Sequence, residues 1–162
     1  FDLPRRHAID RAELDRRWRA LQAQVHPDRF AAQGDAAQRL AMQWAVRVNE
    51  AYQRLKDPVA RGAYLCELAG VPVAAERNTA MPAGFLVQQM AWREALEEAT
   101  DPAALQALDD EVGAAEAALK ADLAASLDER GDAQAAAGQV RSLMFVRRFR
   151  DDLDRRLAAA DH

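Results

Sequence analysis

Apolar residues recur at helical spacing near the start of the chain. Asp10 and Glu13 have the spacing of a capping box, which is typical of a helix N-terminus. Pro27 ends this helix near His26, because a proline pushes the residue before it out of the α region. The pattern therefore predicts a helix with one buried stripe, made of Leu14, Trp18, Leu21 and Val25.

A second helical pattern begins at Asp35. Packing its stripe against the first predicts an antiparallel helical hairpin. The connection, 27–34, is long for a helix pair. A third, shorter helix is predicted to follow and to end at Gly70. Asp57 would cap its start, and Pro58 would occupy its first position. The stripe of the second helix contains Ala41, Trp44, Ala45, Val48, Tyr52 and Leu55.

The rest of the chain is predicted to form three longer helices. The first covers about 82–99, the second starts at Asp101, and a turn at Gly131 leads into the third. An antiparallel up-down-up bundle follows from these lengths and short turns. The stripe of the second helix is Leu105, Leu108, Val112, Ala115, Leu119 and Leu123, and that of the third is Leu143, Val146, Leu153 and Leu157.

The pattern thus predicts an all-α protein of two modules. Residues 1–70 form the first, 71–81 a linker without helical period, and 82–162 the bundle. Charge divides at the same place: the chain is net +3 through Gly70 and net −7 beyond it, giving −4 overall. This asymmetry favours modules with different partners.

Composition narrows the class of protein. The chain is 50% apolar and 30% charged, and its longest uncharged stretch, 78–92, is shorter than the ~20 residues of a membrane span. We therefore expect no membrane contact. The single cysteine, Cys66, fits a reducing compartment and is expected to be buried as a small apolar residue. Because the chain opens on Phe1, we expect a short N-terminal piece, including part of a first helix, to be missing.

The sequence offers no suitable set of residues for catalysis or for metal binding. Metal ligation needs three or four ligands at workable spacing, whereas the histidines and Cys66 are scattered. Ser126 and Ser142 lack a nucleophile motif, and no two glycines lie closer than seven positions, which excludes phosphate loops. We expect no cofactor, no metal and no enzymatic activity. The histidines are His7, His26 and His162.

What remains for His26, Pro27 and Asp28 is presentation to another protein, with an ordinary helix stop as the alternative. The context is LxxxWRxLxxxxHPDRF followed by VNEAYQRLKDPVARGAY, between Leu14 and Tyr64. This region resembles the J-domain of DnaJ-type co-chaperones. The resemblance implies that His26, Pro27 and Asp28 trigger ATP hydrolysis by an HscA/DnaK-type chaperone.

The same resemblance implies a basic docking face on the preceding helix. Arg19 matches a basic position of that face, and Arg16 lies one turn away. Both would steer an acidic surface of the chaperone. For Arg11 and Arg17 we favour a solvated helix face without a partner.

The bundle carries a second candidate surface. On its first helix, Leu86, Val87 and Met90 fall opposite the core stripe, on the side of the acids Glu94, Glu97 and Glu98. Phe145 points away from the stripe of the last helix. Apolar residues facing water beside acids suggest a binding patch. The alternative is that the first module buries Leu86, Val87 and Met90.

Over nearly its whole length the chain resembles the HscB family of iron–sulfur co-chaperones. FDLP, GFLVQQMAWREALEE and RSLMFVRRFRDDL carry this resemblance outside the J-like region. Val87 and Ala91 depart from the family pattern. The resemblance implies a bacterial cytoplasmic protein that binds an IscU-like scaffold through Leu86, Val87, Met90, Glu94, Glu98 and Phe145.

The function predicted is that of a non-enzymatic adaptor. It delivers the scaffold to the chaperone, stimulates the ATPase of the chaperone and aids transfer of the iron–sulfur cluster. Two alternatives stay open. One is a J-protein with a different client. The other is a nucleic-acid-binding module using Arg16, Arg17 and Arg19, against which the net charge of −4 and the lack of a basic stripe in the bundle argue.

Overall fold

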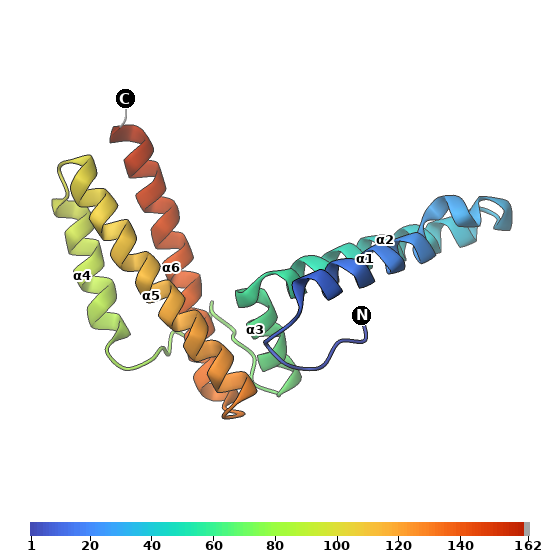
Figure 1. Ribbon diagram of the computed structural model, residues 1–162, viewed down its shortest axis with the longest axis horizontal. Helices are drawn as coiled ribbons and strands as arrows, with labels where there is room; N and C mark the ends of the chain where they lie inside the picture. The colour runs from blue at the N-terminus through green and yellow to red at the C-terminus, as the bar shows by residue number, and fades with distance from the viewer. Residues whose placement is uncertain (161–162) are drawn as a thin grey trace.

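A computed structural model describes residues 1–160 as two helical arms that meet at an angle (Figure 1). One arm is a long helical hairpin and the other is an antiparallel three-helix bundle, so the predicted all-α architecture is confirmed. Within 1–160 there is no strand. The elements are α1 (Arg11–Val25), the 3-10 helix η1 (Pro27–Gln33), α2 (Asp35–Lys56), α3 (Pro58–Leu68), α4 (Phe85–Glu98), α5 (Pro102–Asp128) and α6 (Ala133–Ala160).

The helix ends of the hairpin follow from local chemistry. The Asp10 carboxylate accepts hydrogen bonds from the backbone amides of Ala12 and Glu13, which caps α1. Beyond Pro27 the chain does not form an open loop but the seven-residue helix η1. Gly34 then turns the chain into α2 with a φ of 95°, a conformation that a side chain disfavours.

Polar and aromatic contacts join α1 to α2. The rings of Trp18 and Tyr52 stack at 4.4 Å between centroids. The Tyr52 hydroxyl donates to Asp15 at 2.6 Å. The Asn49 side-chain oxygen accepts from the Trp18 indole at 3.0 Å and also from the amide of Gln22. The residues Asn49 and Tyr52 of the NEAY motif therefore hold the hairpin together.

The prediction that Trp44 belongs to the buried stripe of α2 is wrong. Ala41, Val48 and Tyr52 are buried, but the Trp44 side chain is 53% exposed. Each step of four residues turns the helix by about 40°, so Trp44 lies about 80° around α2 from Tyr52. In the hairpin, α2 packs against α1 and η1, and these two elements leave the Trp44 side of α2 uncovered.

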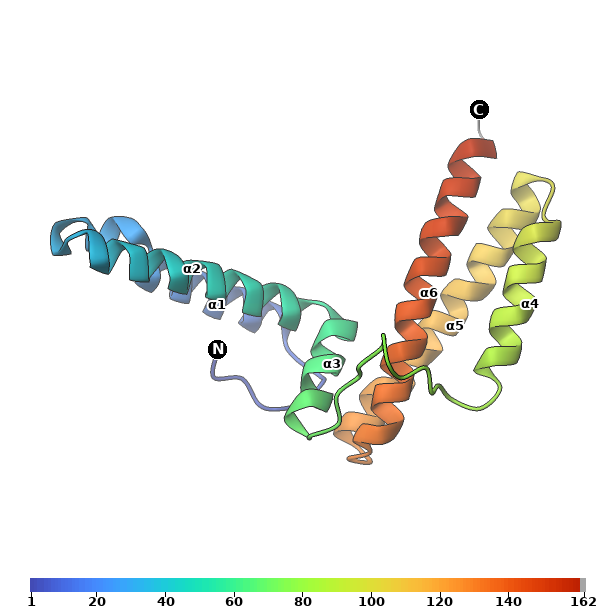
Figure 2. The same cartoon turned by 180° about the vertical axis from the view of Figure 1, so that it is seen from behind.

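The bundle has α6 as its most buried helix. Figure 2 shows α4, α5 and α6 running alongside one another, with α4 on the side away from the hairpin. The outer core lies between α4, α5 and α6 and is centred on Trp92, Val112, Val146 and Leu153. A second core lies at the base, where α3 joins α5 and α6.

Helix α3 belongs to the first predicted module but packs on the second. Val59 and Cys66 share the basal core with Leu123 and Val140, and the prediction that Cys66 is buried is confirmed. Gly62 permits this close approach: a Cβ there would lie 2.8 Å from Leu123 Cδ2 and 3.3 Å from Val140 Cγ2. The base of the hairpin is thereby fixed to the bundle.

An ion pair between Asp57 and Arg147 is a second connection between the arms. Both terminal guanidinium nitrogens of Arg147 donate to the Asp57 carboxylate, one of them at 2.7 Å. The same carboxylate accepts from the Val59 amide at 3.1 Å and so caps α3. The Arg147 guanidinium holds the pKa of Asp57 below its ordinary value.

The N-terminal segment supplies a third connection. The backbone amides of His7 and Ala8 donate to the Asp128 carboxylate at 2.6 and 2.8 Å, at the end of α5. The His7 Nε2–H donates to the Pro58 carbonyl at 3.0 Å, and the Arg61 guanidinium donates to the His7 carbonyl at 2.7 Å. Burial lowers the pKa of the His7 imidazole, which favours this neutral donor.

The segment predicted as a linker packs along α6. Arg141 donates from its guanidinium to the carbonyls of Val73, at 2.9 Å, and Ala80, at 2.5 Å. The division of the chain at 71–81 stays a prediction. Residues 161–162, with the His162 of the metal survey, lie outside the described residues. None of the helices described is both long and apolar enough to cross a membrane.

The ion pair predicts a pH-dependent stability. Because the pKa of Asp57 is lowered in the folded state, the pair stabilises the protein above the unfolded-state pKa near 4 and is lost as the pH falls through the folded-state pKa. Asp57→Asn retains a capping side chain but loses the charge. We expect it to lower the free energy of unfolding by about 1 kcal/mol at pH 7, with the difference shrinking below pH ~4.

Urea denaturation across pH measures this difference. Asp101→Asn is the matched control, because Asp101 caps α5 through the Ala104 amide at 2.8 Å but makes no ion pair with a described residue. A pH-independent loss in Asp57→Asn would show that the ion pair does not carry the effect.

The close approach at Gly62 predicts a difference between two helical glycines. Replacing either Gly62 or Gly113 by alanine improves helix propensity by up to ~1 kcal/mol. A Cβ at Gly113 would meet only ordinary contacts with Arg150, at 3.5 Å or more, whereas one at Gly62 overlaps Leu123. We expect Gly113→Ala to stabilise the protein and Gly62→Ala to be at least about 1 kcal/mol less favourable by thermal denaturation. Equal effects would contradict the packing assignment.

Candidate functional site

The His26-Pro27-Asp28 turn lies at the free tip of the hairpin, far from the bundle (Figure 1). The His26 Nδ1 accepts a hydrogen bond from the Asp28 backbone amide at 3.3 Å and so caps η1. This bond requires an unprotonated Nδ1, which leaves the hydrogen of the neutral ring on Nε2. The Asp28 carboxylate lies 3.7 Å from the same Nδ1.

The turn is shaped before any partner binds. Pro27 fixes one dihedral, and η1 and the end of α1 hold the two sides of the turn. The side chains of His26 and Asp28 are both exposed. An outward Nε2–H donor and a carboxylate acceptor therefore stand side by side, with little conformational entropy left to lose on binding.

Arg16 and Arg19 are both exposed on α1, but their charges are used differently. Arg16 donates to the Glu13 carboxylate at 2.9 and 2.5 Å. Hydrogen bonds from Arg16 and Arg17 lower the pKa of Glu13 to about 2, so Glu13 stays charged at neutral pH. Arg19 forms no ion pair with another described residue. Of the two, Arg19 is the cation that is free for a partner.

Arg11 and Arg17, expected to be merely solvated, make contacts within the protein. Arg17 donates to the Phe1 carbonyl at 2.7 Å and also to that of Asp2, which ties the N-terminal segment to α1. Arg11 donates to Asp15 at 2.9 Å. These arginines serve the fold, and the face opposite Arg17 is the one left open.

The exposed face of α4 is the second candidate site. Leu86, Val87 and Met90 are 67%, 70% and 63% exposed, so the first module does not bury them. Glu94, Glu97 and Glu98 follow on the same helix and are also exposed. The opposite face of α4 is anchored in the core by Phe85 and Trp92, whose indole donates to Glu111 at 3.1 Å. We call the six exposed residues the α4 patch.

The prediction that Phe145 faces away from the core is wrong. Its side chain is 9% exposed and lies 5.8 Å from Phe85 and 6.0 Å from Phe149, measured between ring centroids. The single-stripe pattern fails for α6 because α3, α4, α5 and the 71–81 segment pack around it, so that this helix is buried on nearly all sides. Ala95 lies within about 80° of Phe85 and Trp92 around α4, yet it is exposed.

Arg93 is a residue of this surface that the apolar pattern did not reveal. Its guanidinium lies 5.4 Å from the centre of the Phe145 ring and covers it from the solvent side. On the helix, Arg93 falls within about 20° to 60° of Leu86, Met90 and Glu97. The one feature of the sequence that could have pointed to Arg93 is that it is the single basic residue of α4.

Both candidate sites are exposed surfaces, and they lie at opposite ends of the molecule (Figure 2). Among residues 1–160, no three His, Cys, Asp or Glu side chains group in a way that could hold a metal ion. Exposed donors, acceptors and apolar side chains without an enclosing pocket suit contact with other proteins.

Comparisons with known proteins agree with this arrangement. Residues 81–154 match the family described as the HSCB C-terminal oligomerisation domain. Among solved structures, the chaperone HscB from Vibrio cholerae is 36% identical, with a TM-score of 0.79 over 95% of this chain and 92% of that one. Human co-chaperone protein HscB is 26% identical, with a TM-score of 0.87 over 96% of this chain and 78% of that one.

Curated bacterial sequences are closer. A co-chaperone protein HscB homolog from Bordetella petrii is 52% identical over 154 residues, which are 94% of this chain and 91% of the relative. One from Burkholderia mallei is 50% identical over 165 residues, covering all of this chain and 94% of the relative. With half of its residues identical over nearly the full length of such relatives, the chain belongs to the HscB family of co-chaperones.

Proposed function

We propose that the protein is a non-enzymatic, cytoplasmic co-chaperone that stimulates the ATPase of an HscA/DnaK-type chaperone through His26, Pro27 and Asp28. The observation that carries this proposal is the pre-shaped, exposed turn at the tip of a braced hairpin. The exposed Arg19 on α1 supplies a free positive charge for an acidic surface, and Arg16 adds to it on release from Glu13. The ATP chemistry belongs to the partner.

The client we propose is an IscU-like iron–sulfur scaffold protein, bound by the α4 patch. Three exposed apolar side chains in the first half of α4 offer a dry contact, and three acids in the second half offer charge. Leu86, Val87, Met90, Glu94 and Glu98 are the contact residues in this proposal. Phe145 contributes indirectly in this proposal, because its ring lies beneath the Arg93 guanidinium and supports it.

The separation of the two surfaces supports a division of labour. A scaffold on α4 and a chaperone at the hairpin tip would not obstruct one another, because the arms diverge (Figure 1). The protein would thus deliver the loaded scaffold and trigger the ATPase in one complex, aiding cluster transfer to recipient proteins. If the client were a different protein, it would bind to the same α4 patch with a different affinity.

We predict that variants of the turn lose the stimulation of the chaperone ATPase while the fold stays intact. His26→Gln removes the outward Nε2–H geometry and Asp28→Asn removes the charge of the acceptor. Both side chains are exposed, so the helical content by circular dichroism should not change. We expect stimulation of chaperone ATP turnover to fall by about tenfold or more in each variant.

Gln33→Ala, at the exposed end of η1, is the matched control for this loop and should stimulate normally. Full stimulation by His26→Gln or Asp28→Asn would disprove the assignment of the turn.

A double variant of the α4 patch separates the client site from the chaperone site. Leu86→Ser/Met90→Ser removes two of the three apolar side chains of the patch and leaves the hairpin unchanged. We expect the scaffold affinity, measured by calorimetry, to fall by about tenfold or more and the scaffold-dependent gain in ATP turnover to vanish.

Met42→Ser is the control for the loss of an exposed apolar side chain, since Met42 lies on α2 and is comparably exposed. Unchanged scaffold binding by Leu86→Ser/Met90→Ser would refute the patch. Equal loss of stimulation with and without scaffold would indicate misfolding.

A further inference from the structure

Arg93 lies beside the α4 patch and has no ion-pair partner within residues 1–160. Glu97 follows it at the four-residue spacing at which ion pairs form on a helix. The Arg93 guanidinium does not pair with that carboxylate. It lies instead over the Phe145 ring, 5.4 Å from the ring centre. The only cation of α4 is therefore fixed at one edge of the patch, toward α6.

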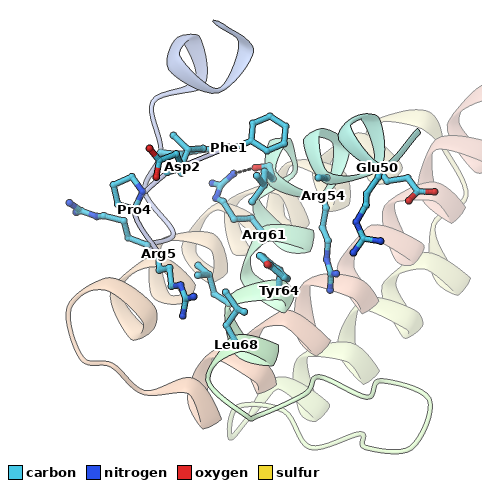
Figure 3. A pocket seen from close by; sticks show the side chains of 16 residues that line it. Phe1, Asp2, Pro4, Arg5, Glu50, Arg54, Arg61, Tyr64 and Leu68 are labelled. Carbon is cyan, nitrogen blue, oxygen red and sulfur yellow. Dashed lines mark hydrogen bonds between the residues drawn. The ribbon is translucent and has the colours of Figure 1, made fainter. Parts of the chain in front are cut away.

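A stacked arginine elsewhere in the protein shows what this arrangement lacks. The Arg54 guanidinium lies 4.7 Å from the centre of the Tyr64 ring, and Figure 3 shows the two side chains beside one another. The same guanidinium pairs with the Glu67 carboxylate at 2.6 Å. Arg54 thus has both a ring against its face and a carboxylate for its N–H donors.

Arg11 repeats this combination on α1. Its guanidinium lies 5.8 Å from the centre of the Tyr52 ring and donates to the Asp15 carboxylate at 2.9 Å. Arg93 has the ring, that of Phe145, but its carboxylate does not come from residues 1–160. A partner protein is the source that remains for it.

The stacking prepares Arg93 for such a contact. A guanidinium carries five N–H donors in one plane, and a ring against its face leaves these donors available. Arg93 is exposed, whereas the Phe145 ring beneath it is held between Phe85 and Phe149. A cation whose plane is already supported loses less conformational freedom when it binds a carboxylate through two hydrogen bonds.

The neighbours of Arg93 define what else this partner must present. Along α4, Met90 precedes Arg93 by about 4.5 Å, and Glu97 follows it by about 6 Å. This edge of the patch is therefore apolar, then positive, then negative. Glu94 and Glu98 add negative charge beside it, which disfavours a polyanion such as a nucleic acid. The complementary protein surface is apolar, then negative, then positive.

The order of charges also distinguishes two directions of binding. A client turned end to end would place its basic group against Arg93 and its carboxylate against Glu97. Like charges in contact penalise that direction, whereas an apolar and acidic surface without Arg93 would not penalise it in the same way.

We propose that Arg93 is a specificity-determining residue of the client site, which binds a carboxylate of the client protein and thereby selects the direction in which the client lies on α4. This inference rests on the proposed client site and adds the charge order that a client must present. Phe145 acts in it only as the support of the Arg93 guanidinium.

Calorimetry of the full chain with the purified IscU-like scaffold tests this proposal through three variants. Arg93→Met keeps an unbranched side chain over the Phe145 ring but removes the charge, and Arg93→Lys keeps the charge but removes the planar fork. We expect the scaffold affinity to fall by about tenfold in Arg93→Met, by less in Arg93→Lys and by more in Arg93→Glu.

Charge reversal on the scaffold separates recognition from a structural role. Each exposed carboxylate of the scaffold is replaced in turn by lysine. One such scaffold variant should bind the parent chain more weakly than the unchanged scaffold does, and should bind Arg93→Glu more tightly. Support of the Phe145 ring alone would not produce this exchange of preference.

Arg39→Met is the matched control, because Arg39 is exposed on α2 and forms no ion pair with a described residue. It makes the same change of charge on the other arm and should bind the scaffold normally. Circular dichroism and thermal denaturation check the fold of all four variants.

The outcomes distinguish this inference from the proposed function. If the parent chain does not bind the scaffold, the proposed client site fails and the inference fails with it. If the parent chain binds and Arg93→Met binds equally well, the client site stands and Arg93 has no part in it. Weaker binding by Arg93→Met that no charge-reversed scaffold exchanges for Arg93→Glu would assign Arg93 to the support of Phe145 and would also overturn the inference.

Discussion

The docking of α3 on α5 and α6 determines where both proposed surfaces point. Gly62 brings the backbone of α3 against Leu123 and Val140, and the Asp57–Arg147 pair fixes the start of the same helix. The N-terminal segment, held by Asp128, closes the third side of the joint. These three contacts involve different parts of the chain and together hold the joint, so the hairpin has a set direction relative to α4.

The motifs that resemble a J-domain divide into two groups by what they do. In NEAY, Asn49 and Tyr52 join the two helices of the hairpin. In DPVARGAY, Asp57, Arg61 and Gly62 attach α3 to the bundle and the N-terminal segment. At the tip, His26 and Asp28 present exposed polar groups. Much of the motif therefore builds the support that gives two exposed residues a fixed place.

Local chemistry is why the helices could be predicted from the sequence. Asp10, Asp57 and Asp101 cap helices through amides two or three residues away, so their effect is visible in a short window. Burial is different, because it depends on how many neighbours surround a helix. Trp44 was expected inside and is exposed, because α1 and η1 leave its side of α2 uncovered, whereas Phe145 was expected outside and is enclosed. The Asp57–Arg147 pair, 90 residues apart, has no local signal at all. Exposure of Leu86, Val87 and Met90 likewise followed from the fold and not from the helix pattern alone.

The length of α2 gives the joint at α3 a mechanical meaning. With 22 residues, α2 is about 33 Å long, and it carries the turn at the end remote from the bundle. A tilt of about 5° at the base would displace that end by about 3 Å, the length of a hydrogen bond. The hairpin is a lever arm, and the angular stiffness of a joint made by one glycine, one ion pair and a few buried side chains sets how accurately His26 and Asp28 are aimed.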